Sequence, residues 1–109
     1  MIYAARHPDK VAGVINFSGG WWSELNSGAD FNSSALAAAG RDDKVPELWL
    51  YADHDHYYTL PYIRKNFAGF RTDGGVGEYH EFEDIPGNGH ALFGYISRWQ
   101  GIVAAYLRQ

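Results

Sequence analysis

The sequence predicts an α/β protein in which helices flank a parallel sheet of about three strands, folded as a single domain over residues 1–109. Two observations lead to this prediction. The runs VAGVINF and PELWLYAD are largely apolar, which is typical of parallel strands buried on both faces. Strand-like segments also alternate with segments of helical spacing, which indicates βαβ units. A chain of 109 residues is long enough for one small domain and too short for two.

Three segments are predicted strands. Residues 11–17 (VAGVINF) and 46–53 (PELWLYAD) are the two buried ones. Residues 77–84 (GEYHEFED) alternate between apolar and polar side chains, as a more exposed strand does. In this third strand we expect Tyr79 and Phe82 to point inward.

Four segments are predicted helices. The first ends at Pro8, with Arg6 and His7 in its last turn. Residues 34–40 (SALAAAG) predict a short helix that Gly40 stops. Its candidate N-cap residues are Asn32, Ser33 and Ser34. Residues 59–70 have helical spacing in Leu60, Ile63, Phe67 and Phe70. The closing helix, within 94–109, has one apolar side formed by Ile96, Trp99, Val103 and Tyr106 or Leu107.

The composition excludes several classes of function. The net charge is −4 and no long run of one sign occurs, so the chain has no electrostatic footprint for nucleic acid. No apolar stretch approaches the roughly 20 residues of a membrane span. Cysteine is absent, which excludes a disulfide framework and thiolate zinc sites but leaves the compartment open. The aromatic content of 17% indicates a large core or an aromatic-lined cleft.

The opening residues, MIYAARHPDK, lack the apolar segment of a signal peptide and look like the end of a helix. Two interpretations stay open. Either the first helix is short, or sequence that belongs upstream of it is missing.

Polar residues gather in three loops that should meet at one edge of the sheet. The loops are SGGWW after the first strand, DHDHYY after the second and PGNGHALF after the third. Ligands of parallel α/β sheets bind outside the carboxyl ends of the strands. The three loops therefore form the strongest candidate for a functional site.

Two of these loops can supply a catalytic acid and base. Adjacent parallel strands lie about 5 Å apart, so loops that leave their same ends can bring Asp55 and His90 together. An aspartate that accepts the Nδ1–H of a histidine fixes its tautomer and stabilises the imidazolium that forms when the histidine takes a nucleophile's proton. Gly87 and Gly89 would let the backbone turn tightly beside His90.

Three stretches resemble a known family: AARHPDKVAGVINFSGG, VPELWLYADHDHYY and GNGHALF. Together they are similar to the C-terminal half of an α/β-hydrolase, most closely of the dienelactone hydrolase-like branch. The resemblance implies that Asp55, three residues beyond Ala52, is the catalytic acid and that His90 is the base. It implies hydrolysis of a small-molecule ester or lactone without a metal or organic cofactor.

The family's nucleophile motif is not in this sequence. A Gly-x-Ser-x-Gly elbow between a strand and a helix carries that serine, and no such motif occurs in residues 1–109. The nearest candidate, Ser18, follows a strand but lacks the preceding glycine. In the alignment that the resemblance implies, the elbow lies upstream of Met1, so this chain would carry acid and base without nucleophile.

Four aromatic residues are candidates for contacts with the substrate. They are Trp21, Trp22, Tyr57 and Phe93, each in or beside one of the three loops. For each there is a structural alternative: the tryptophans could cap the core, Tyr57 could pack at the start of a helix, and Phe93 could lie in the core.

Two other classes of function remain as alternatives. His54 and His56 would place two imidazoles on one face of an extended strand, and Asp53 or Asp55 could add oxygen ligands to form a metal site. Otherwise His54 and His56 are surface residues, which the pattern favours. The chain could instead be a non-catalytic interaction module or half of a split enzyme, self-associating through an exposed edge of the sheet beside its first strand.

Overall fold

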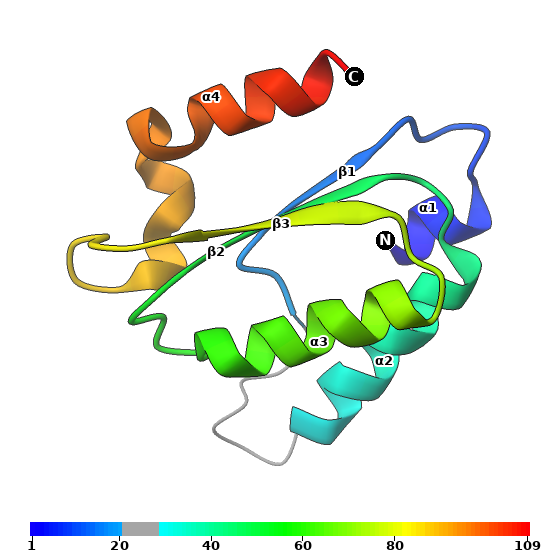
Figure 1. The fold of residues 1–109 in the computed structure, drawn as a ribbon, viewed down its shortest axis with the longest axis horizontal. Coiled ribbons are helices and arrows are strands. Elements are labelled where there is room, and N and C mark those ends of the chain that lie inside the picture. Colours follow the sequence, from blue (N-terminus) through cyan, green and yellow to red (C-terminus); the bar gives the residue numbers. More distant parts are fainter. Residues whose placement is uncertain (21–28) are drawn as a thin grey trace.

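A computed structural model describes residues 1–20 and 29–109, and its three strands form one parallel sheet. The strand order is β1 (Val14–Phe17), β2 (Glu47–Ala52), β3 (Gly77–Phe82), so β2 is central (Figure 1). The helices are α1 (Ile2–Arg6), α2 (Ala29–Asp42), α3 (Leu60–Thr72), the 3₁₀ helix η1 (Gly89–Gly94) and α4 (Ile96–Leu107). The predicted α/β class, with a parallel sheet flanked by helices, is confirmed.

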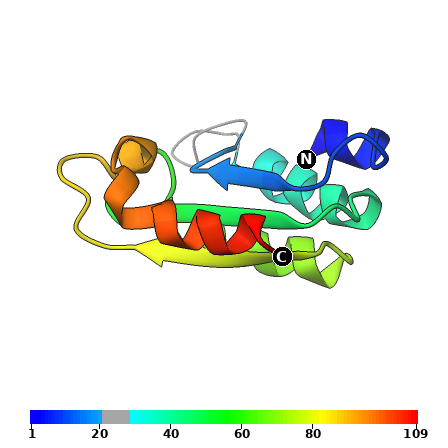
Figure 2. The ribbon, with the colours of Figure 1, turned by 90° about the horizontal axis from the view of Figure 1, so that it is seen from above.

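The helices cover the sheet from both faces. In Figure 1 the sheet lies between α4 on one side and α2 and α3 on the other. Seen from the α4 side in Figure 2, α4 lies over β2 and β3. None of the helices among the described residues is long and apolar enough to cross a membrane.

Strand β2 supplies the centre of both hydrophobic clusters. All six of its residues are buried. Because side chains alternate along a strand, Leu48, Leu50 and Ala52 pack towards α4, in the cluster that includes Leu92 and Tyr106. The intervening side chains lie in the opposite cluster, which consists of Leu36, Trp49, Tyr51, Tyr58, Ile63 and Phe70. The prediction that this strand is buried on both faces is confirmed.

Helix α2 is longer than predicted. It runs over Ala29–Asp42 instead of 34–40, and Gly40 lies inside it, so the prediction of a stop at Gly40 is wrong. A Cβ on Gly40 would lie 2.2 Å from the carbonyl oxygen of Phe70 in α3. The glycine is therefore explained by the close approach of the two helices. The predicted caps are also wrong, and Ser33 instead donates a hydrogen bond to Asn66 Oδ1 in α3 at 2.7 Å.

The apolar side of α4 is rotated from the predicted one. Trp99, Val103 and Tyr106 pack on the sheet as predicted, whereas Ile96 and Leu107 are 56% and 68% exposed. The Tyr106 hydroxyl donates to the carbonyl oxygen of Pro46 at 2.6 Å, which fixes the rotation of the helix. At 3.6 residues per turn, Leu107 is turned about 100° and Ile96 about 80° away from Tyr106.

Two carboxyl groups are buried at the amino-terminal end of β2. Asp43 and Glu47 are both fully buried. Asp43 accepts the backbone N–H of Val45 at 2.9 Å, and Glu47 accepts the indole N–H of Trp49 at 2.6 Å. Burial, and in addition the neighbouring Asp43, raises the pKa of Glu47 to about 8.

The stability of the chain should therefore depend on pH. Between pH 4.5 and about 8, Glu47 is protonated in the folded chain and ionised in the unfolded chain. The free energy of unfolding then falls as pH rises through this window, by on the order of a few kcal/mol. We expect Glu47→Gln, which keeps an acceptor for Trp49, to remove most of this fall in urea titrations at pH 5 and pH 8.5. An equal fall in Glu47→Gln and in the exposed control Glu83→Gln would contradict the assignment.

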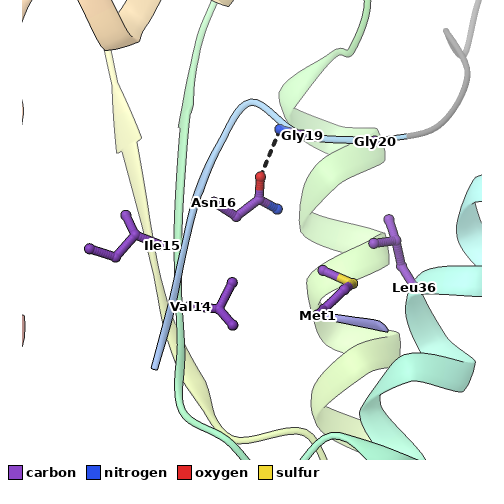
Figure 3. Close-up of a pocket in the computed structure, with 7 residues that line it drawn as sticks. All are labelled: Met1, Val14, Ile15, Asn16, Gly19, Gly20 and Leu36. Atoms are coloured by element: carbon purple, nitrogen blue, oxygen red, sulfur yellow. Dashed lines mark hydrogen bonds between the residues drawn. The ribbon is translucent and has the colours of Figure 1, made fainter. Parts of the chain in front are cut away.

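Strand β1 lies at an edge of the sheet. Its alternate N–H groups pair with β2, from Val14 to Pro46 and from Ser18 to Leu50. Among the described residues no strand pairs with its other side. A groove of about 230 Å³ runs along this edge. Figure 3 shows the residues that line it, which are Met1, Val14, Ile15, Asn16, Gly19, Gly20 and Leu36. Charged residues and proline usually protect an edge strand from pairing with another chain, and residues 11–20 contain neither.

We propose that copies of the chain associate through this edge. Light scattering on a sizing column should give a mass above that of the 12.2 kDa monomer at micromolar concentration. Val14→Lys should shift the population towards monomer because it places a charge in the groove. Val76→Lys, at a 44% exposed position remote from β1 in the sheet, is the matched control. A clean monomer at all concentrations would contradict the proposal.

Candidate active site

The loops that follow β2 and β3 lie together at the carboxyl edge of the sheet. Both strands end at this edge, beside η1, in Figures 1 and 2. Strand β2 ends at Ala52 and carries Asp55 three residues beyond its end, while β3 ends at Phe82 and leads into η1, which contains His90. The parallel register of β2 and β3 is therefore what brings the two loops side by side.

Asp55 and His90 form the hydrogen bond that the sequence predicts. His90 Nδ1 lies 3.0 Å from Asp55 Oδ2. A carboxylate can only accept, so His90 donates from Nδ1 and its neutral ring presents Nε2 as an acceptor. The Asp55 side chain is 2% exposed and that of His90 is 39% exposed. The carboxylate is thus enclosed, and the imidazole reaches the surface.

Backbone groups hold the Asp55 carboxylate in place. Its Oδ1 accepts the N–H of Tyr57 at 2.7 Å and that of Tyr58 at 3.2 Å. These bonds leave Oδ2 directed at His90. Short local bonds of this kind are typical of aspartate in turns, and here they orient the carboxylate towards His90.

Two tyrosines border the imidazole of His90. The ring of Tyr57 is 4.6 Å from it between centroids, and the ring of Tyr58 is 6.2 Å from it. Tyr57 is 47% exposed, whereas Tyr58 is buried. Tyr57 therefore lies where a molecule approaching His90 would meet it, and its role in substrate binding stays a prediction.

Asn88 connects the two loops, which the sequence alone did not suggest. Its Oδ1 accepts the N–H of His90 at 2.9 Å and the N–H of His56 at 3.0 Å. The first bond caps η1. An asparagine two residues before the histidine, at the start of a helical turn, is a cap signal that could have been recognised. The second bond spans 32 residues and has no local signal.

Gly89 allows the two loops to touch. Its N–H donates to the carbonyl oxygen of His54 at 3.1 Å. A Cβ on Gly89 would lie 2.0 Å from the carbonyl oxygen of Asp53. Gly87 has φ of +75° and supplies the left-handed turn. The two glycines expected beside His90 thus serve different purposes, one a turn and the other a close approach.

The polar neighbours of Asp55 are placed differently from it. His54 has φ of +54°, and its side chain is 79% exposed, with Nε2 3.7 Å from Asp53 Oδ2. His56 is also exposed. Within residues 1–20 and 29–109, no group of three or more histidine, aspartate or glutamate side chains could hold a metal ion.

The remaining predicted contacts with substrate have different outcomes. Trp21 and Trp22 lie outside the described residues. Phe93 is 64% exposed, so its placement in the core is wrong. Its ring packs against Phe17 at 5.1 Å and Trp99 at 5.9 Å, because the short η1 helix turns it outward over the end of β1. The role of Phe93 in substrate binding stays a prediction.

The loop after β1 is tied to β2 by Tyr51. The Tyr51 hydroxyl donates to the carbonyl oxygen of Gly19 at 2.5 Å and accepts from Asn16 Nδ2 at 3.0 Å. Ser18 lies in this loop with φ of +54° and is 3% exposed. Among residues 1–20 and 29–109, its Oγ has no hydrogen-bond partner. A buried hydroxyl without a basic partner does not have the placement of an activated nucleophile.

Comparison with known proteins adds no relative: no family model, no curated protein and no solved structure matches this chain. What the chain does is therefore inferred from the geometry of Asp55, His90 and the loops that carry them.

Gly89→Ala should weaken the contact between the two loops. A methyl group at this position meets backbone, which cannot move aside cheaply, so we expect a loss of about 1–3 kcal/mol in the free energy of unfolding. Gly94→Ala, at the other end of η1, adds a Cβ with nothing within 4 Å and is the matched control. The measurement is urea unfolding of both variants, and equal stabilities would contradict the close approach.

Proposed function

We propose that the chain supplies the acid and the base of a Ser-His-Asp relay in a serine hydrolase acting on a small-molecule ester or lactone. One observation carries this proposal: the enclosed carboxylate of Asp55 holds Nδ1 of His90, whose ring is partly exposed. The resemblance of the sequence to the C-terminal half of dienelactone hydrolase-like α/β-hydrolases supports the same two roles.

The proposed chemistry follows from this geometry. His90 would take the proton of a serine hydroxyl on Nε2 while the serine oxygen attacks the carbonyl carbon, and would then return the proton to the leaving alcohol oxygen. Asp55 would hold the tautomer and stabilise the imidazolium in between. A hydrolytic water would repeat the sequence to release the acid product. These steps require no metal or organic cofactor.

The proposed nucleophile comes from polypeptide outside these 109 residues. No Gly-x-Ser-x-Gly motif occurs in the sequence, and Ser18 is buried without a basic partner in the part of the chain that the structure describes. The oxyanion hole of an α/β-hydrolase uses the residue after the nucleophile and an earlier loop, so it would come from the same polypeptide. We therefore expect the 109-residue chain alone to be close to inactive.

A second candidate is a non-catalytic interaction module or one half of a split enzyme. The unprotected edge of β1 and the groove beside it favour this candidate. The two candidates differ in what lies beyond the present sequence: a serine elbow is required by the first and not by an interaction module.

The coding DNA upstream of the Met1 codon tests the proposal. We expect an in-frame Gly-x-Ser-x-Gly motif a few codons before Met1, and activity of the longer protein on a short-chain aryl ester. Asp55→Asn and His90→Ala should each lower kcat by about 10³–10⁴, because loss of the acid gives the wrong tautomer and loss of the base leaves the serine unactivated.

Two variants of neighbouring residues are the controls for this assay. Asp53→Asn and His54→Asn change the same loop without touching the Asp55–His90 bond, and asparagine tolerates the positive φ of residue 54. Both should retain kcat within a few fold. Full activity of Asp55→Asn and His90→Ala, or an in-frame stop codon just upstream of Met1, would refute the proposal.

A further inference from the structure

We propose that Asn88 is a positioning residue that sets the orientation of His90 relative to Asp55. This inference rests on the proposed function for its catalytic meaning, but the geometry that it concerns can be measured in the 109-residue chain itself. Asn88 need not touch a reacting atom: it acts through the backbones of the two loops that carry the acid and the base.

The carbonyl oxygen of the Asn88 side chain receives one N–H from each loop. His90 N lies 2.9 Å from it and His56 N lies 3.0 Å from it. His56 directly follows Asp55 in the chain, and His90 carries the base itself. This atom thus links the backbone that follows Asp55 to the backbone of His90, beside the direct bond from Gly89 N–H to the carbonyl oxygen of His54.

The three consecutive N–H groups that follow Asp55 are all hydrogen-bonded, one of them to Asn88. Those of Tyr57 and Tyr58 point to Asp55 Oδ1, and that of His56 points to Asn88 Oδ1. The turn that holds the Asp55 carboxylate is therefore anchored at its first N–H by a residue of the other loop. If this anchor is lost, the backbone bond from Gly89 to His54 still joins the loops on the other side of Asp55, but the turn over residues 55–58 can move relative to His90 although the bonds of Tyr57 and Tyr58 remain.

A purely local role for Asn88 is the alternative that must be separated from this one. Asn88 is the N-cap residue of η1, and a cap alone would explain its bond to His90 N. Serine is an equally good cap, but its oxygen is bonded directly to Cβ and reaches less far than the amide oxygen of asparagine. Asn88→Ser therefore keeps the cap and gives up the bond to the other loop.

The test compares three variants of the full chain: Asn88→Ser, Asn88→Ala and Asn88→Asp. The last keeps an oxygen at the same distance from Cβ and serves as the conservative rescue. Long-range ¹H–¹⁵N correlation spectra report which ring nitrogen of His90 carries the proton, with His90→Ala identifying the signals. Amide hydrogen exchange reports the protection of His56 N–H, and exchange at Leu48 in the buried centre of β2 checks that each variant is folded.

We expect the wild-type chain and Asn88→Asp to carry the neutral-ring proton on Nδ1. In Asn88→Ser and Asn88→Ala this preference should be lost, and the His56 amide should exchange about three- to tenfold faster, as expected for one lost hydrogen bond. If Asn88→Ser keeps both the Nδ1–H tautomer and the protection of His56, Asn88 is only a cap and the inference is overturned.

The same spectra separate this inference from the proposed function. Asp55→Asn should change the tautomer of His90, because an amide does not hold the ring as a carboxylate does. If the wild-type ring carries no preference for Nδ1–H, the Asp55–His90 bond is not formed in solution, and the inference falls together with the basis of the proposed function. If the wild-type preference is present and survives in Asn88→Ser, the inference alone fails.

Discussion

The burial of β2 on both faces is the constraint on which the rest of this molecule depends. All six of its residues are buried, and its alternate side chains reach opposite hydrophobic clusters. A parallel strand in this position must leave the core at its carboxyl end, where its polar continuation meets solvent. Asp55 is carried by that continuation, three residues beyond Ala52. The core therefore determines where the acid lies, and the pairing of β3 with β2 determines where the base can reach it.

The buried carboxyl groups at the two ends of β2 have different surroundings. At the carboxyl end, Asp55 accepts three hydrogen bonds, two from backbone N–H groups and one from His90. At the amino end, Asp43 and Glu47 lie fully buried beside each other and accept one N–H each, from Val45 and Trp49. Donors stabilise a negative charge, whereas burial beside another carboxyl group opposes it. The raised pKa of Glu47 follows from the second arrangement.

Sequence patterns predicted the strands of this structure and missed most features that depend on distant contacts. The apolar run of β2 and the three strands were predicted because strand period is visible in one stretch of chain. The Asp55–His90 bond joins residues 35 positions apart, and it was predicted from the common edge of parallel strands and from the resemblance to a known family. Gly40 was misread as a helix stop because its reason lies in α3, against the carbonyl oxygen of Phe70. The bond from His56 N to Asn88 joins residues 32 positions apart, so no window of sequence contains it.

Asp55 and His90 differ in how far their side chains are exposed to solvent. Asp55 is closed off behind His90 by its own turn, while the His90 ring is partly open and bordered by the exposed Tyr57. Among the described residues, the pair is therefore more accessible from the side of His90. The loop after β1 offers no reacting group among the described residues, since Tyr51 ties Gly19 to the sheet and the Ser18 hydroxyl is buried. A nucleophile that completes the relay would have to approach across the exposed face of His90.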